Sequence, residues 1–171
     1  MHLVLPLSIN GSMLNGQREK LAWCLRYKIA LGVASGITYL HKGCQRRIIH
    51  RDVKSDNICL LKILNLRYLP PELFMQCTVD EKTDVYAFGL LLLELITGQP
   101  VIDDSHQSLV MWAKPMLIGK NYAELVDPSL GEAYQKVKLA SICIHQSSTE
   151  RPKMSQVVRM LKGNEGILPI K

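Results

Sequence analysis

The apolar residues between Leu21 and His41 recur every three or four positions, which is the spacing of an amphipathic helix. They are Leu21, Leu25, Ile29, Val33, Ile37 and Leu40. Lys42-Gly43 supplies the residues that commonly end such a helix. Gly32 and Gly36 lie four positions apart on it, and this spacing predicts close packing of the helix against a neighbour.

The run Val85–Ile96 is apolar on nearly every helical face, and Glu94 is its only charged residue. A helix of this kind must be buried, so the run predicts a core helix that ends at Gly98-Gln99-Pro100. Three shorter segments also have helical patterns, the last with Ser155 as its expected cap. They are Ser108–Leu117, Lys136–His145 and Ser155–Leu161.

Two short apolar runs, His2–Leu7 and Ile58–Leu61, predict buried strands. The groups Asn10-Gly11-Ser12 and Asn15-Gly16 predict a loop after the first of them. Because helical patterns outnumber strand patterns, the chain is predicted to be mainly α, in the α+β class.

The stretch Ile48–Leu61 reads IIHRDVKSDNICLL and places five polar residues between two apolar runs. The five are His50, Arg51, Asp52, Lys54 and Asn57. Their order, H-R-D-x-K-x-x-N, resembles the catalytic loop of protein kinases. The alternative is a solvated loop with capping Asp and Asn side chains, which explains the residue types but not their fixed spacing.

This resemblance implies a role for each polar residue of the loop. Asp52 would be the catalytic base that accepts or orients the proton of the attacking hydroxyl, and Lys54 would contact the transferred phosphate. Asn57 would be a magnesium ligand, which makes ATP and Mg²⁺ the implied cofactors. A lysine at position 54 resembles serine/threonine-specific kinases more than tyrosine-specific ones.

Composition narrows the function classes further. The 171 residues are 47% hydrophobic, enough for one globular domain. The formal net charge of +6 comes from scattered basic residues without interleaved aromatics, so a nucleic-acid interface is not expected. The five cysteines are odd in number and lack CxxC spacing, which favours free thiols in a reducing compartment. With no apparent signal peptide or membrane span, the expected location is cytoplasmic.

Longer motifs make the resemblance more specific. YLHKGCQRRIIHRDVKSDN, VDEKTDVYAFGLLLLELITG, SLVMWAKP, ELVDPSLG and SSTERPKMSQVV are similar to plant receptor-like cytosolic serine/threonine kinases, in the group associated with Rop GTPases. The match implies a partial protein kinase domain over residues 1–165, consisting of the hinge strand and the C-terminal lobe, followed by a short tail at 166–171.

Further roles follow from the same resemblance. Asp84 would fix the backbone of the turn formed by His50 and Arg51, from the start of the buried helix. Glu72, in the sequence Pro70-Pro71-Glu72 that resembles the A-P-E motif, would pair with Arg151.

Several kinase motifs do not occur in these 171 residues. There is no G-x-G-x-x-G-x-V loop, no V-A-I-K lysine and no D-F-G between Asn57 and Pro71, which only thirteen residues separate. The N-terminal lobe and the activation segment are therefore expected to be largely missing. Because those parts hold the phosphates and the metal, the chain as written is expected to be inactive.

Two functions remain open. The first is an ATP-dependent serine/threonine protein kinase of plant signalling, which acts on protein substrates and is represented here by a truncated chain. The second is a non-catalytic kinase-like module that binds a Rop-type small GTPase or another kinase. A degenerate chain without function is the third alternative.

Overall fold

The computed structural model describes residues 13–14, 17–18, 22–54, 80–102, 105–126 and 134–163. Over these ranges the chain is mostly helical, which confirms the predicted fold class. Two short strands pair antiparallel, β1 (Met13–Leu14) with β2 (Gln17–Arg18). The helices are α1 (Trp23–Lys42), α3 (Glu81–Thr97), α4 (Leu109–Ile118), α5 (Tyr122–Leu125), α6 (Tyr134–Cys143) and α7 (Met154–Leu161), with a 3₁₀ turn at Ser148–Glu150.

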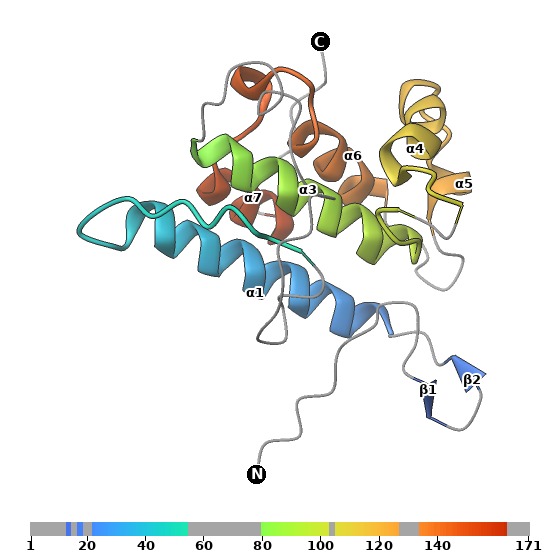
Figure 1. Cartoon of the computed structure of the whole chain (residues 1–171), viewed down its shortest axis with the longest axis horizontal. Helices are drawn as coiled ribbons and strands as arrows, with labels where there is room; N and C mark the ends of the chain where they lie inside the picture. Colours follow the sequence, from blue (N-terminus) through green and yellow to red (C-terminus); the bar gives the residue numbers. More distant parts are fainter. Residues whose placement is uncertain are drawn as a thin grey trace.

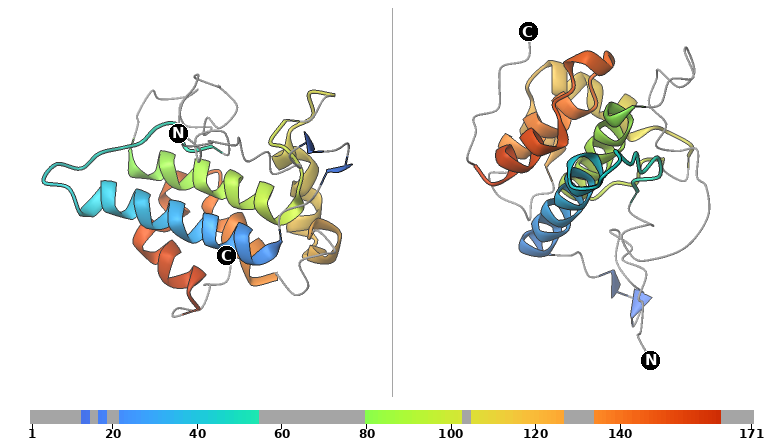
Figure 2. Two further views of the ribbon diagram at one scale, coloured as in Figure 1. Left: turned by 90° about the horizontal axis from the view of Figure 1, so that it is seen from below. Right: turned by 90° about the vertical axis from the view of Figure 1, so that its left-hand side faces the viewer.

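Helix α3 is the centre of the molecule. Every residue from Thr83 to Thr97 is buried, so the core helix predicted from the all-round apolar run is confirmed. Helix α1 lies beside α3 and runs in the opposite direction, which brings the end of α1 next to the start of α3 (Figures 1 and 2). Helix α6 packs against α3, and α7 packs against α1.

Both ends of α3 are capped in the way that its sequence indicates. The Asp80 carboxylate accepts a hydrogen bond from the backbone N–H of Lys82 at 2.8 Å. Gly98 has the left-handed conformation, with φ 70°, and its N–H bonds to the carbonyl of Glu94. The buried Glu94 carboxylate accepts the N–H of Val101 at 3.0 Å, which helps to satisfy a charged group inside the core.

The glycine that permits close helix packing is Gly89 rather than the predicted pair. A Cβ atom at Gly89 would lie 2.7 Å from the Cβ of Cys143 and 2.7 Å from Cγ2 of Ile144, so α3 and α6 approach each other there. Within the part of the chain that the structure describes, a Cβ atom at Gly32 or Gly36 would meet nothing within 4 Å. The prediction of close packing at Gly32 and Gly36 is therefore wrong, because this face of α1 borders open space.

Helices α1, α4, α6 and α7 begin and end within two residues of the predicted bounds. The predicted strands at His2–Leu7 and Ile58–Leu61 lie outside the described residues. Residues 15 and 16 of the predicted loop also lie outside the described residues, and on either side of them Leu14 of β1 pairs with Gln17 of β2. Among the described helices, none is long and apolar enough to cross a membrane.

Candidate functional site around Asp52 and Asp84

Asp84 fastens the loop that carries the kinase-like motif to the first turn of α3. Its buried carboxylate accepts three hydrogen bonds of 2.8 Å. Oδ2 accepts the backbone N–H of His50 and bonds to Nε2 of His41, and Oδ1 accepts the backbone N–H of Arg51. A carboxylate removed from water requires such partners, and the amino-terminal end of a helix favours its negative charge.

The backbone at Arg51 is in the left-handed region, with φ 67°. Residues with a side chain adopt this conformation rarely, and the surrounding structure must hold them there. The hydrogen bond from the Arg51 N–H to Asp84 supplies part of that restraint. The turn is therefore held in a defined shape immediately before Asp52.

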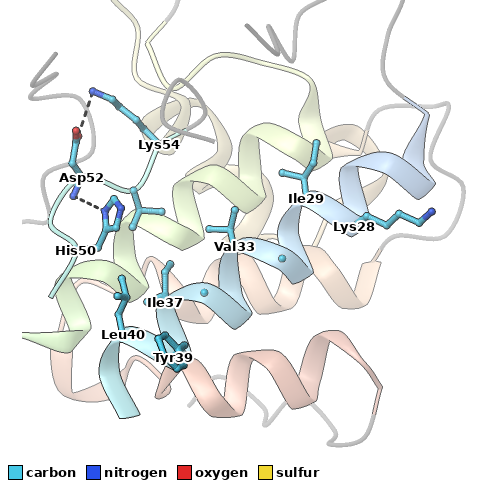
Figure 3. Close-up of a pocket in the computed structure, with 12 residues that line it drawn as sticks. Lys28, Ile29, Val33, Ile37, Tyr39, Leu40, His50, Asp52 and Lys54 are labelled. Carbon is cyan, nitrogen blue, oxygen red and sulfur yellow. Dashed lines mark hydrogen bonds and ion pairs between the residues drawn. The ribbon is translucent and has the colours of Figure 1, made fainter. Parts of the chain in front are cut away.

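Asp52 and Lys54 form an ion pair at this loop. The Lys54 ammonium lies 3.3 Å from Oδ1 of Asp52, with the lysine side chain 1% exposed and the aspartate side chain 36% exposed. The backbone N–H of Asp52 donates to Nδ1 of His50 at 3.3 Å. The loop thus presents a partly accessible carboxylate beside a buried cation (Figure 3).

A cavity of about 610 Å³ lies between this loop and α1. Its apolar wall is formed by α1, including Ile29, Val33 and Ile37, and its polar end carries Asp52 and Lys54 (Figure 3). Gly32 and Gly36 line the same wall, which explains the open space beside them.

Arg151 is almost fully buried and braces the same end of α3. Its guanidinium donates to three backbone carbonyls, from Nε to His145 at 2.8 Å, from Nη1 to Lys82 at 3.1 Å and from Nη2 to Gln146 at 3.3 Å. The group also lies over the ring of Tyr86, 4.7 Å from its centroid. Such a stacked and multiply bonded guanidinium joins α3 to the segment before α7.

Two groups near this brace have shifted pKa values. Burial lowers the pKa of the Lys82 ammonium, which donates to the carbonyl of Arg151. Burial also raises the pKa of the Cys143 thiol, which lies at the end of α6 where this helix packs against α3. Cys143 is a free thiol, as are Cys24 and Cys44, in agreement with the absence of a disulfide pattern.

The structure gathers most of the residues that the sequence singled out. His50, Arg51 and Asp52 share one loop, and both Lys54 and Asp84 contact that loop. Arg151 reaches the first turn of α3 through the carbonyl of Lys82. The predicted residues Asn57 and Glu72 lie outside the described residues, so the expected Glu72–Arg151 pair lies outside them as well.

Sequence reasoning missed two contributors. His41 bonds to Asp84 from the last turn of α1, and Tyr86 stacks on Arg151 from α3. His41 continues the apolar face four residues after Ile37, and a histidine at such a position could have been recognised as buried and in need of a partner.

The predicted cap of α7 is wrong. The capping residue is Lys153 rather than Ser155, and the Ser155 hydroxyl accepts a hydrogen bond from the Lys42 ammonium.

Within the described ranges, no three His, Cys, Asp or Glu side chains are grouped so that they could hold a metal ion. Asn57, the predicted magnesium ligand, lies outside the described ranges.

Comparison with known proteins gives consistent matches. The sequence model of protein tyrosine and serine/threonine kinases matches residues 60–161. The receptor-like cytosolic serine/threonine-protein kinase RBK2 of Arabidopsis thaliana is 49% identical, over 98% of this chain and 45% of the relative. RBK1 of the same plant is 41% identical, over 97% of this chain and 44% of its own length.

The chain spans less than half the length of these relatives. The alignment with RBK2 runs over 205 residues, more than the 171 of this chain, so some of the aligned relative has no counterpart here. Among solved structures, the pseudokinase domain of BIR2, described as an immune regulator, matches with a TM-score of 0.72 and 29% identity. That match covers 84% of this chain and 52% of the other.

Proposed function

Because this chain belongs to the protein tyrosine and serine/threonine kinase family, we propose that Asp52 and Lys54 are its phosphoryl-transfer residues. The observation that carries this proposal is the Asp52–Lys54 pair on a loop whose backbone both oxygens of Asp84 hold. In this proposal, residues 1–165 form a partial kinase domain and 166–171 a short tail. The reaction is transfer to serine or threonine hydroxyls of protein substrates, as the names of the relatives indicate.

Each residue has a task that suits its surroundings. The Asp52 carboxylate is partly accessible, so it can accept the proton of a substrate hydroxyl. The Lys54 ammonium is held beside Asp52. From this position it can neutralise negative charge on the group transferred to the substrate hydroxyl. His50 and Arg51 contribute through their backbone N–H groups, which fix the turn before Asp52.

The residues present do not make a complete site for magnesium and ATP. Kinases of this family use ATP and Mg²⁺, and Asn57 is the proposed metal ligand on this chain. The glycine-rich loop, the V-A-I-K lysine and the D-F-G aspartate, which would supply the other contacts, do not occur in the 171 residues. We therefore infer that this chain by itself neither binds magnesium–ATP tightly nor transfers phosphate.

A second candidate is a non-catalytic module that binds another kinase or a small GTPase of the Rop type. The similarity to the BIR2 domain favours it, because that domain is described as a pseudokinase and BIR2 as an immune regulator. A cytosolic location is proposed from the names of RBK2 and RBK1.

The proposal is tested with the purified 171-residue chain, labelled ATP, Mg²⁺ and a generic protein substrate. We expect no incorporation above that of the Asp52→Asn variant, and no saturable nucleotide binding by calorimetry. Incorporation that disappears in Asp52→Asn would support Asp52 as the base but contradict the inferred inactivity. Incorporation that persists in this variant would exclude Asp52 as the base.

A further inference from the structure

The face of α1 that turns away from α3 is apolar and exposed. Leu25, near the start of the helix, is 46% exposed, and Tyr39, near its end, is 63% exposed. Ile48 is also 46% exposed, and its backbone N–H bonds to the carbonyl of Leu40 at 3.0 Å. Three of the five exposed large hydrophobic side chains in the described residues therefore belong to α1 or lie against its end.

Between its two ends this face of α1 is hollow. Gly32 and Gly36 lie there, and within the described ranges a Cβ atom at either would have no neighbour within 4 Å. The cavity of about 610 Å³ opens along the same stretch, with Ile29 and Val33 in its wall (Figure 3). Glycine is less favourable than alanine inside a helix, and no contact among the described residues requires it here. The two glycines leave room for a second backbone to approach α1.

The order of residues on this face makes it complementary to itself. Consider two α1 helices that cross antiparallel about the midpoint between Gly32 and Gly36. Gly32 then lies against Gly36 of the second copy, and Ile29 lies against Tyr39 of the second copy. Every such pair occurs twice in a two-fold contact, so large apolar side chains meet at both ends and the glycines meet at the crossing.

The charges at the two ends of the cavity indicate the same occupant. Lys28 is exposed at one end, and Asp52, whose side chain is 36% exposed, lies at the other (Figure 3). The two-fold crossing brings Lys28 of the second copy toward Asp52, which places opposite charges together twice. An anionic membrane surface would attract Lys28 and repel Asp52, so the two charges favour a second copy of this chain over a lipid surface.

We propose that the chain forms a two-fold symmetric dimer through the exposed face of α1. Each copy contributes Lys28 to the polar end of the other cavity and reduces access to the other Asp52. The proposal does not depend on phosphoryl transfer, because these contacts require only the charge of Asp52 and not its action as a base. One helix face buries less than the roughly 1,600 Å² of a standard interface, so we expect a micromolar dimer.

The association is measured by sedimentation velocity of the purified 171-residue chain at about 1–100 µM. A reducing agent is present because the Cys24 thiol is exposed, and a disulfide between two copies would imitate the dimer. We expect a reversible equilibrium between monomer and dimer. The dissociation constant should rise with salt concentration, since salt screens the pairs formed by Lys28 and Asp52.

The substitution Gly36→Leu tests the crossing point. It places a side chain where the two helices would meet, at a position with room for it in the described part of the monomer. The dissociation constant should rise about tenfold or more, while urea denaturation shows no loss of monomer stability, because leucine favours a helix more than glycine does. The matched control is Cys24→Leu, at an exposed position on another side of α1, which should leave the dissociation constant unchanged.

A double-mutant cycle tests the predicted charge pair. Lys28→Glu should raise the dissociation constant about tenfold, whereas Lys114→Glu, the same change of charge at an exposed position on α4, should have little effect. In an Asp52→Asn background, Lys28→Glu should have a much smaller effect, because the carboxylate that repels the new glutamate is absent.

Four results would overturn the proposal. They are a monomer at every concentration, a dimer that persists in Gly36→Leu, additive effects of Lys28→Glu and Asp52→Asn, and particles larger than a dimer without a defined size. The last result would identify non-specific association of the exposed apolar face.

Discussion

The substitution Asp84→Asn removes charge from the buried hydrogen-bond centre while preserving the size of the side chain. The wild-type carboxylate accepts from two backbone N–H groups and bonds to His41, each at 2.8 Å. An asparagine can place its single oxygen where Oδ2 accepts from His50 and His41. Its amide group then faces the N–H of Arg51, so two donors oppose each other and one bond is lost.

The magnitude follows from these contacts. Losing a hydrogen bond to a charged acceptor costs about 1.5–3 kcal/mol, and leaving a buried donor unsatisfied costs about 1–3 kcal/mol. Because the two remaining bonds also weaken when the acceptor becomes neutral, we expect Asp84→Asn to lower the free energy of unfolding by about 2–4 kcal/mol. That is a large share of the roughly 5–15 kcal/mol typical of a domain.

Urea denaturation followed by circular dichroism measures this change. The control is Glu81→Gln, one turn earlier on the same helix, whose carboxylate lies 3.7 Å from the exposed Arg47. This ion pair should contribute less than about 1 kcal/mol. If Asp84→Asn changed stability no more than the control does, the view that Asp84 anchors the loop energetically would be refuted.

Three further predictions concern the packing around α3. Gly89→Ala should lower stability by about 1–3 kcal/mol in urea denaturation, since its Cβ would lie 2.7 Å from Cys143, whereas Gly32→Ala should be neutral or stabilising by up to about 1 kcal/mol. Arg151→Met should lower the melting temperature markedly, because three carbonyls lose their donor, and an unchanged temperature would contradict the bracing role. Burial raises the pKa of the Cys143 thiol, so its contribution to stability is present below the unfolded pKa of about 8.5 and declines as pH rises above it. Native-state alkylation read by mass spectrometry should label Cys24 and spare Cys143, and equal labelling would show that Cys143 is accessible.

The core helix and the loop motif could be predicted because each has a strong local pattern. Val85–Ile96 lacks a polar face, so burial on all sides was the only favourable arrangement. The spacing from His50 to Lys54 identified the loop, and the resemblance then placed Asp84 beside it. These features depend on order along the chain, which a sequence displays directly.

Contacts between distant residues could not be predicted in the same way. Gly32, Gly36 and Gly89 are all glycines inside helices, and nothing local in the sequence shows which of them a second helix approaches. The close contact with α6 is what distinguishes Gly89. The bond from His41 to Asp84 joins residues 43 positions apart, and the local pattern at His41 does not name its partner. Arg151 satisfies its donors with carbonyls of the chain, whose positions depend on the folded backbone.

The most direct test of the account restores what these 171 residues lack. Kinase segments that carry the motifs absent from the 171 residues are joined to this chain, and phosphate transfer to a protein substrate is measured. They are an N-terminal lobe with the glycine-rich loop and the V-A-I-K lysine, and a D-F-G segment inserted between Asn57 and Pro71. We predict that the restored protein is active, that the 171-residue chain is not, and that Asp52→Asn abolishes the restored activity. Restored activity that survives Asp52→Asn would contradict the role assigned to this loop.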